Sequence, residues 1–408
     1  MPGPLHGIRV IELANVLLGP WTCQILADMG ADVIKVEPLE GDRVRSLGPH
    51  KSTENMGALF LGLNRNKRSV VIDLKSNNGI TSFLKLAESA DVLVHNLRPQ
   101  AMARLGLDYP SVSVVNPSLV YAYACGYGQT GPYAERGAVD DSMQAACGLT
   151  ALNERIFGEP RFTPTVVCDK TTALMLTCGV LSALYHRAQT GEGQEVEVPM
   201  METMVGLLMV EHLWGQSFEP PQGPMGYKGS LSAGRRPAAT KDGFIAILTY
   251  LDPAWGNFCK MVERPDLLAD PRFKNLAERI RHIDDVYAET AKIMATKTTA
   301  EWETLFKGTS MPYTIVNTLE DLAEDPHLKA VGFWKSIDHP TEGKLRWPSF
   351  PVNYSDSPAE VRRPAPRLGE HSTEILREAG YSDAEIAAML ADGTTAADPA
   401  VNTSTEVA

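Results

Sequence analysis

The chain has 408 residues, 44% of them apolar and 22% charged, and a formal net charge of −12. This is the composition of a globular protein with one large domain or two smaller ones, and its acidic balance argues against a nucleic-acid partner. The chain has no run of about 18 apolar residues and no secretory leader pattern, so we expect neither a membrane span nor export. The six cysteines are scattered without a CxxC pair, which indicates reduced, buried thiols in a cytoplasmic protein, with no disulfide frame and no metal site.

The first 125 residues alternate short β-rich runs with segments of helical periodicity. Gly30, directly after the first of these helical segments, is a typical residue beyond a helix C-terminus. Strands are predicted at residues 8–13, 31–37, 68–75, 91–97 and 118–128, and helices at 21–29, 79–90 and 99–107. Strands that alternate with helices favour a parallel sheet, so we predict an α/β fold with a doubly wound domain.

The remainder of the chain is predicted to be mainly helical in two stretches, 139–184 and 252–322, and the second of these indicates a smaller domain. A short strand is predicted directly before Asp169. Residues 215–234, rich in Gly, Pro and Ser, indicate a linker or long loop. Further strands are predicted at 193–200 and 242–250, a helix at 200–215, and a closing helix pair at 370–393.

Two features of the first half bear on a ligand. Between Arg43 and Arg104 ten basic residues face four acidic ones, a local charge of +6. This segment either holds a small anionic ligand or forms a solvated face. Glu37 ends the second strand, where a ribose-binding acid would stand, but the preceding turn has one glycine and two bulky residues, Leu17 and Leu18. This turn argues against a nicotinamide or flavin site.

The acid Asp169 follows the apolar run Val166-Val167-Cys168 and precedes a segment that begins Lys-Thr-Thr-Ala-Leu. An Asp in this position is a good helix N-cap. It is also well placed to be a reactive carboxylate at a helix start. The residues alone leave both interpretations open.

Seven segments, in order from residue 8 to about residue 377, together resemble the family III CoA-transferases, which include formyl-CoA and carnitine CoA-transferases and the related 2-methylacyl-CoA racemases. They include "VIELANVLLGPWTCQILADMGADVIKVE", "NRNKRSVVIDLK", "ADVLVHNLRPQAMARLGL", "YGQTGPYAERGAVDDSMQAACGL" and "CDKTTALMLTCGVLSALYHRAQTGEGQEVEVPM". The resemblance implies a Rossmann-like large domain, a smaller inserted α+β domain, and two subunits interlocked as a homodimer. The expected boundaries are 1–215 and 331–392 for the large domain, 216–330 for the linker and smaller domain, and 393–408 for a disordered tail.

The resemblance also implies a chemistry for Asp169. In such transferases the matching Asp attacks an acyl-CoA thioester, forms a mixed anhydride and releases CoA thiolate, which is covalent catalysis. A helix start would keep this carboxylate ionised at neutral pH. CoA is then a substrate, the second substrate is a carboxylic acid, and neither a metal nor a redox cofactor is expected.

Carried over by position, the resemblance implies a CoA site along the large domain. The basic members of this set would pair with CoA phosphates, and the leucines would offer an apolar wall and backbone groups. The expected contacts are Leu17, Leu18, Ile72, Lys75, Asn96, Arg98 and Arg104. The loop 226–237 matches a glycine-rich loop that closes over the acyl-enzyme in formyl-CoA transferase, although it lacks consecutive glycines, and a mobile lid is expected there.

Racemases of this group place a His directly before an Asp, and here Val139 stands at the His position and Asp140 at the Asp position. Valine cannot exchange a proton, so the sequence favours transfer. Asp140 is expected either to tune Asp169 or to be a structural hydrogen-bond partner. Two alternatives remain open: a racemase or acyl-CoA hydrolase on the same fold, and an acyl-CoA-binding homologue without activity.

Overall fold

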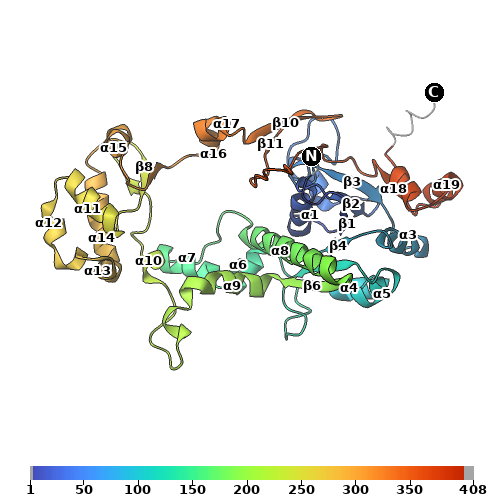
Figure 1. The fold of residues 1–408 in the computed structure, drawn as a ribbon, viewed down its shortest axis with the longest axis horizontal. Coiled ribbons are helices and arrows are strands. Elements are labelled where there is room, and N and C mark those ends of the chain that lie inside the picture. Colours follow the sequence, from blue (N-terminus) through green and yellow to red (C-terminus); the bar gives the residue numbers. More distant parts are fainter. Residues whose placement is uncertain (1–2, 399–408) are drawn as a thin grey trace. The chain divides into compact units, whose positions relative to one another are not determined.

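The computed structural model of the chain describes residues 3–398, and its ribbon is drawn in Figure 1. Within this range the chain forms two compact units. The first unit comprises residues 3–147, 164–205 and 329–398, and the second comprises residues 148–163 and 206–328. The domain boundaries expected at residues 215 and 330, and the inserted character of the smaller domain, stay predictions.

A six-stranded parallel sheet forms the centre of the first unit, with the strand order β3-β2-β1-β4-β5-β6. The order reverses at β1, so the sheet is doubly wound, and the predicted parallel α/β sheet is confirmed. The strands are β1 (Arg9–Leu13), β2 (Asp32–Glu37), β3 (Lys67–Val71), β4 (Val92–His95), β5 (Val120–Cys125) and β6 (Gln194–Pro199). All five strands predicted before residue 128 and the strand predicted at 193–200 are present.

Local signals in the sequence account for the crossover helices. Gly30 follows the first helix with φ of 107°, a conformation that glycine adopts without strain. The side chain of Ser76 accepts a hydrogen bond from the N–H of Gly79 and caps α3. The elements of this part are α1 (Leu18–Asp28), the 3₁₀ turn η1 (Arg43–Ser46), α2 (Ala58–Leu63), α3 (Asn77–Ala87), α4 (Pro99–Leu105) and α5 (Tyr109–Val115).

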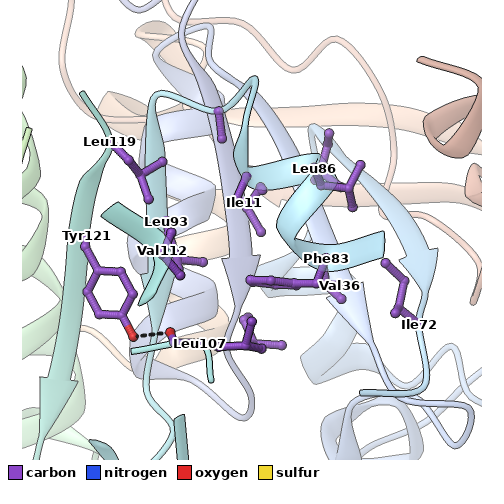
Figure 2. Packing of buried hydrophobic residues seen from close by; sticks show 14 of the residues in the cluster. Ile11, Val36, Ile72, Phe83, Leu86, Leu93, Leu107, Val112, Leu119 and Tyr121 are labelled. Carbon is purple, nitrogen blue, oxygen red and sulfur yellow. Dashed lines mark hydrogen bonds between the residues drawn. The ribbon is translucent and has the colours of Figure 1, made fainter. Parts of the chain in front are cut away.

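One face of the sheet packs against α3, α4, α5 and α18 (Ser372–Glu378) through a large apolar cluster. Figure 2 shows Ile11, Leu93 and Tyr121 of the strands in one apolar cluster with Phe83 of α3. The hydroxyl of Tyr121 donates to the carbonyl of Leu107 at 2.8 Å, so this buried phenol has its partner. Alternate strand residues face the opposite side, where α1 and α8 (Val167–Thr190) pack.

The segment before Asp169 corrects one prediction. Val167 and Cys168 belong to the first turn of α8, a 24-residue helix, so the strand expected there is wrong. By length and composition α8 is the one described helix that resembles a membrane span, a property that core helices share. It packs against α1, β5 and β6. It also contacts α6 (Asp140–Ala146). Along the chain, α7 (Leu149–Phe157) precedes α8, and α9 (Met200–His212) follows β6.

The second unit has its own antiparallel sheet, with the order β7-β8-β9, and its own apolar core. Trp255, Phe258, Trp302 and Phe306 are buried in this core. Its elements beyond α7 are η2 (Trp214–Ser217), α10 (Lys228–Leu231), β7 (Ala238–Ala239), β8 (Phe244–Ile247), α11 (Asp252–Met261), α12 (Pro265–Ala269), η3 (Pro271–Phe273), α13 (Leu276–Arg281), α14 (Ile283–Met294), α15 (Thr299–Phe306), β9 (Tyr313–Ile315), α16 (Leu319–Glu324) and α17 (Pro326–Ala330).

The C-terminal part returns to the first unit through the hairpin β10 (Trp334–His339) and β11 (Gly343–Pro348), followed by α18 and α19 (Asp383–Ala391). The tail expected to be disordered is packed at residues 394–398. Thr394 and Thr395 are buried, and the hydroxyl of Thr395 donates to the carbonyl of Val71 at 2.6 Å. The expectation is therefore wrong for these residues, and residues 399–408 lie outside the described range.

Candidate active site

A cavity of about 740 Å³ opens in the first unit at the carboxyl ends of the central strands. Four segments surround it: the turn between β1 and α1, the segment after β4, the loop after β5, and the start of α8. This is the crevice where parallel α/β sheets bind ligands. Its lining includes Val16, Leu17, Leu18, Asn96, Arg98, Gln129, Arg136, Gly137, Val139, Asp140, Asp169 and Met200.

Asp169 lies in the wall of this cavity as the third residue of α8. Its backbone N–H donates to Oδ1 of Asp140 at 2.9 Å. The other oxygen of Asp140 accepts from Nε2 of Gln144 at 2.7 Å. Asp140 therefore accepts one N–H of the first turn of α8, and since the N-cap position is held by Val166, the N-cap interpretation of Asp169 is wrong. Among residues 3–398, the carboxylate of Asp169 itself makes no hydrogen bond, so both of its oxygens are free.

Burial and the nearby charge of Asp140 raise the pKa of Asp169 from its ordinary value of 3.8 to about 6. Burial outweighs any lowering of the pKa by the helix start, but the expected ionisation of Asp169 at neutral pH is not contradicted. A carboxyl group with this pKa is still mostly ionised at pH 7. It is also a more basic oxygen nucleophile than an ordinary Asp.

The two roles expected for Asp140 coincide in one side chain. The residue is 6% exposed and both its oxygens accept hydrogen bonds, which is the structural role. Its negative charge also contributes to the raised pKa of Asp169, which is the tuning role. Val139, the adjacent residue, is 67% exposed and lines the cavity, so no proton-transfer side chain occupies that position.

Four of the seven expected CoA contacts line the cavity: Leu17, Leu18, Asn96 and Arg98. The other three do not. The side chain of Ile72 is 1% exposed and belongs to the apolar core drawn in Figure 2, so it is not available to a ligand. Lys75 and Arg104 are exposed outside the lining of the cavity. A contact between CoA and these two residues stays a prediction.

Asn96 contacts protein rather than open space. Its side-chain oxygen accepts from the N–H of Asn15 at 2.9 Å, and its amide donates to the carbonyl of Asn15 at 2.8 Å. Asn96 thus fixes the turn between β1 and α1. Arg98 projects toward Gly137, where an added Cβ would come within 3.0 Å of its guanidinium.

The structure adds a cationic group that the sequence interpretation missed. Arg136 lines the cavity, and its guanidinium lies 3.7 Å from the centre of the Tyr133 ring. Arg136 lies in "YGQTGPYAERGAVDD", part of one of the segments that carried the family resemblance. Its position in that segment could have indicated from the sequence that it lines the site.

Nine of the ten basic residues between Arg43 and Arg104 do not line the cavity. Arg45 pairs with Glu37 at 2.7 Å, Arg65 with Asp28 at 2.6 Å and Lys67 with Glu12 at 2.7 Å, all nearly or fully buried. Arg68 pairs with Asp32, Glu374 and Glu378. A solvated basic face is therefore the wrong interpretation for these four residues. Arg98 is the member of the segment that lines the cavity.

Three further expectations concern the lid loop, metal binding and the cysteines. The loop 226–237 lies in the second unit and contains the short helix α10; a lid function stays a prediction. Within residues 3–398, no group of three or more His, Cys, Asp or Glu side chains could hold a metal ion. All six cysteines are free thiols, but Cys178 is exposed, which corrects the expectation that they are all buried.

The sequence model of CoA-transferase family III matches residues 5–372. The chain belongs to CoA-transferase family III. A succinate–glutarate CoA-transferase of Agrobacterium fabrum is 32% identical over 386 residues, which cover 92% of this chain and 95% of that protein. A formyl-CoA:oxalate CoA-transferase of Rhodopseudomonas palustris is 32% identical, with coverage of 95% and 96%.

A solved structure agrees with this assignment. The crystal structure of a CAIB/BAIF family protein from Brucella suis superposes with a TM-score of 0.78 at 30% identity, covering 93% of this chain and all of that one. The family III resemblance noted from the sequence motifs is confirmed, and with it the class of enzyme, a CoA-transferase.

Proposed function

We propose that this enzyme transfers CoA from an acyl-CoA thioester to a free carboxylic acid, with Asp169 as the covalent nucleophile. The observation that carries the proposal is a carboxylate in the wall of a large cavity. Neither of its oxygens accepts a hydrogen bond from residues 3–398, while its backbone N–H donates to Asp140. Carboxylates that serve only structure usually accept hydrogen bonds from nearby donors. This one is positioned by its main chain and left open to a substrate.

In the proposed mechanism an oxygen of Asp169 attacks the thioester carbonyl, the C–S bond breaks, and CoA leaves as a thiolate. The product on the enzyme is a mixed anhydride between Asp169 and the acyl group. The acceptor carboxylate then attacks the aspartyl carbonyl and displaces the first acid. The thiolate finally attacks the acyl carbonyl of the new anhydride, which forms the new thioester and restores the carboxylate of Asp169.

The pKa of about 6 suits both requirements of this nucleophile. At neutral pH the group is mostly ionised and able to attack, and its basicity exceeds that of an ordinary Asp. In this proposal the CoA moiety extends along the turn of Leu17 and Leu18, and its anionic groups pair with Arg98 and Arg136, which line the same cavity.

The proposed acceptor class is carboxylic acids, in keeping with the names of the relatives, among them a (R)-2-hydroxy-4-methylpentanoate CoA-transferase of Clostridioides difficile. Racemisation is less well supported because Val139 offers no second proton-transfer group beside Asp169. No metal or redox cofactor takes part in the steps above.

We also propose that the working form is a homodimer located in the cytoplasm. Three apolar side chains of α8, Leu174, Met175 and Tyr185, are 50%, 51% and 70% exposed. They lie on a long helix whose other side packs on the sheet. Exposed apolar patches of this kind mark interaction surfaces, and a second copy of the chain is the proposed occupant. The free thiols agree with a reducing compartment.

The decisive experiment is to trap the anhydride. The protein is incubated with a panel of acyl-CoA thioesters, quenched with hydroxylamine or borohydride, and mapped by mass spectrometry. A modification at Asp169 that is absent from Asp169→Ala supports the proposal. Failure of every thioester to give an adduct, together with α-proton exchange into a 2-methylacyl-CoA, would replace transfer by racemisation.

A further inference from the structure

A buried polar cluster lies between the sheet and the start of α1. Glu12, Lys35 and Lys67 come from the first three strands, and Asp42 from the segment after β2; none of the four side chains is exposed. Nζ of Lys35 lies 2.8 Å from Glu12 and 2.9 Å from Asp42, and Nζ of Lys67 lies 2.7 Å from Glu12. Buried ion clusters often add little net stability compared with apolar packing, so stability alone does not explain why these charged residues are buried here.

The cluster contacts the main chain of the turn between β1 and α1. Nζ of Lys35 donates to the carbonyl of Ala14 at 2.9 Å. Oδ1 of Asp42 accepts from the N–H of Val16 at 3.2 Å. Asn96 holds both backbone groups of the intervening Asn15. Three consecutive residues of the turn are thus held through their backbone by side chains distant in sequence.

Val16 adopts a conformation that needs such support. Its φ is 69°, in the left-handed region that β-branched residues rarely enter. Strained residues of this kind persist only where the surroundings fix them, and they are concentrated at functional sites. Val16 lines the cavity that contains Asp169, and its side chain is 44% exposed, so packing of that side chain does not explain the conformation.

The strained residue determines how α1 begins. Leu17 and Leu18 follow it and line the same cavity. The first turn of α1 has no side-chain cap and no acidic residue. Among residues 3–398, no hydrogen bond reaches the N–H groups of Leu18 and Gly19. The start of α1 therefore stands in the cavity wall with unpaired donors.

The position of Asp42 is fixed by contacts within the protein, with Glu37 and through it with Arg45, and needs no ligand. Its N–H donates to Oε1 of Glu37 at 3.0 Å, and both oxygens of Glu37 bind the guanidinium of Arg45 at 2.7 Å. Gly41, the residue before it, has φ of 75°, and a Cβ there would come within 2.9 Å of the Arg45 side chain. The tight turn thus fixes where the carboxylate of Asp42 points.

We propose that Asp42 is a positioning residue for the reaction at Asp169: held by Lys35, its carboxylate keeps Val16 in the left-handed conformation and so places Leu17 and Leu18 against the bound acyl-CoA. This inference rests on the proposed function. Asp42 acts through the turn and does not touch the reacting atoms.

The test is the variant Asp42→Asn. In this variant the side-chain oxygen can still accept from the N–H of Val16, but the side-chain NH2 group then faces the ammonium of Lys35. Because both groups are donors, the hydrogen bond between position 42 and Lys35 is lost. We expect the KM for acyl-CoA to rise about tenfold, the loss of one buried charge-assisted hydrogen bond, with kcat changed by less than about twofold. A residue with only a structural role would lower the amount of active protein and the apparent kcat while leaving KM unchanged.

Asp28→Asn is the matched control. Asp28 is also a buried Asp paired with a cation, Arg65, but it lies at the far end of α1, and its change should leave KM at the wild-type value. The second arm is the double variant Asp42→Asn with Val16→Gly. Glycine adopts the left-handed conformation without support from Asp42, so the KM for acyl-CoA should return most of the way to the wild-type value. Absence of this recovery would overturn the inference.

If Asp42→Asn does not fold, Val16→Pro tests the same point with the Lys35–Asp42 pair intact. Proline removes the N–H and fixes φ near −65°, so KM should rise as much as in Asp42→Asn; an unchanged KM overturns the inference.

The trapped adduct separates the two proposals. Wild type without any Asp169 adduct removes the proposed function and this inference with it. An adduct in wild type, with equal KM for the Asp42 and Asp28 variants, removes this inference alone.

Discussion

Replacing Asp169 by Asn should stabilise the folded protein while it abolishes activity. The carboxylate makes no hydrogen bond among the described residues, so the substitution removes no partner. Its pKa rises from 3.8 to about 6 on folding, through burial and the charge of Asp140. A raised carboxyl pKa means that ionisation opposes folding, and this cost grows as pH rises from about 4 to about 6 and is complete above that.

The magnitude follows from the size of the rise. Each pKa unit corresponds to about 1.36 kcal/mol, which gives about 3 kcal/mol for ionised Asp169, and partial exposure to solvent reduces this to about 2 kcal/mol. We therefore expect Asp169→Asn to exceed wild type by about 2 kcal/mol in free energy of unfolding at pH 7.5, and by less than about 1 kcal/mol at pH 4.5.

The assay is urea unfolding of both proteins at the two pH values and at one fixed protein concentration, because an oligomer would make stability depend on concentration. All other titrating groups are shared, so the difference between the proteins isolates position 169. Equal gains at both pH values, or a wild type that is the more stable protein at pH 7.5, would refute the burial argument.

Three further predictions concern the cavity. The acidic limb of the pH profile of kcat/KM is expected near pH 6 in wild type, and Asp140→Asn should move it to lower pH by less than about one unit. The shift is small because burial, and not Asp140, is the larger cause of the raised pKa of Asp169. A limb that moves to higher pH would contradict this. Arg98→Ala should raise the KM for acyl-CoA about tenfold and weaken its dependence on salt, and steady-state kinetics at two ionic strengths checks both. Val139→His should confer α-proton exchange into a 2-methylacyl-CoA, measured by deuterium incorporation from solvent, and no exchange would show that a second base alone does not make a racemase.

Local patterns were enough to predict the sheet. Apolar runs of strand length, separated by helical periodicity, gave six strands in the observed parallel sheet. Residues such as Gly30 and Ser76 mark helix ends through their own backbone and side chains, so the signal lies within a few residues of the feature. This is why the strands and crossover helices were predictable one by one.

The start of α8 was not predictable in the same way. Val166-Val167-Cys168 has the composition of a strand, and a strand was predicted. Among the described residues this run belongs to no sheet, and the hydrogen bond from Asp169 N–H at the start of the helix goes to Asp140, 29 residues earlier. A cap supplied from so far along the chain leaves no local signature beside the helix it stabilises.

The basic segment shows the same limit for charge. Counting residues gives +6 between Arg43 and Arg104, yet Arg45, Arg65, Lys67 and Arg68 are neutralised by carboxylates that the fold brings to them. Arg68 reaches Glu374 and Glu378, about 300 residues away. Local net charge therefore overstated the cationic surface, and only the cavity itself shows which arginines remain for an anionic ligand.

Asp140 explains how Asp169 can be both well placed and available. A helix start needs an acceptor for its free N–H groups, and an Asp in the first turn commonly supplies one. If Asp169 did so, an oxygen would be occupied and its basicity lowered. Because Asp140 accepts that N–H instead, Asp169 keeps both oxygens, and the neighbouring negative charge raises its pKa further. One buried carboxylate thus accepts an N–H of the helix start and raises the basicity of the other, as the proposed nucleophile requires.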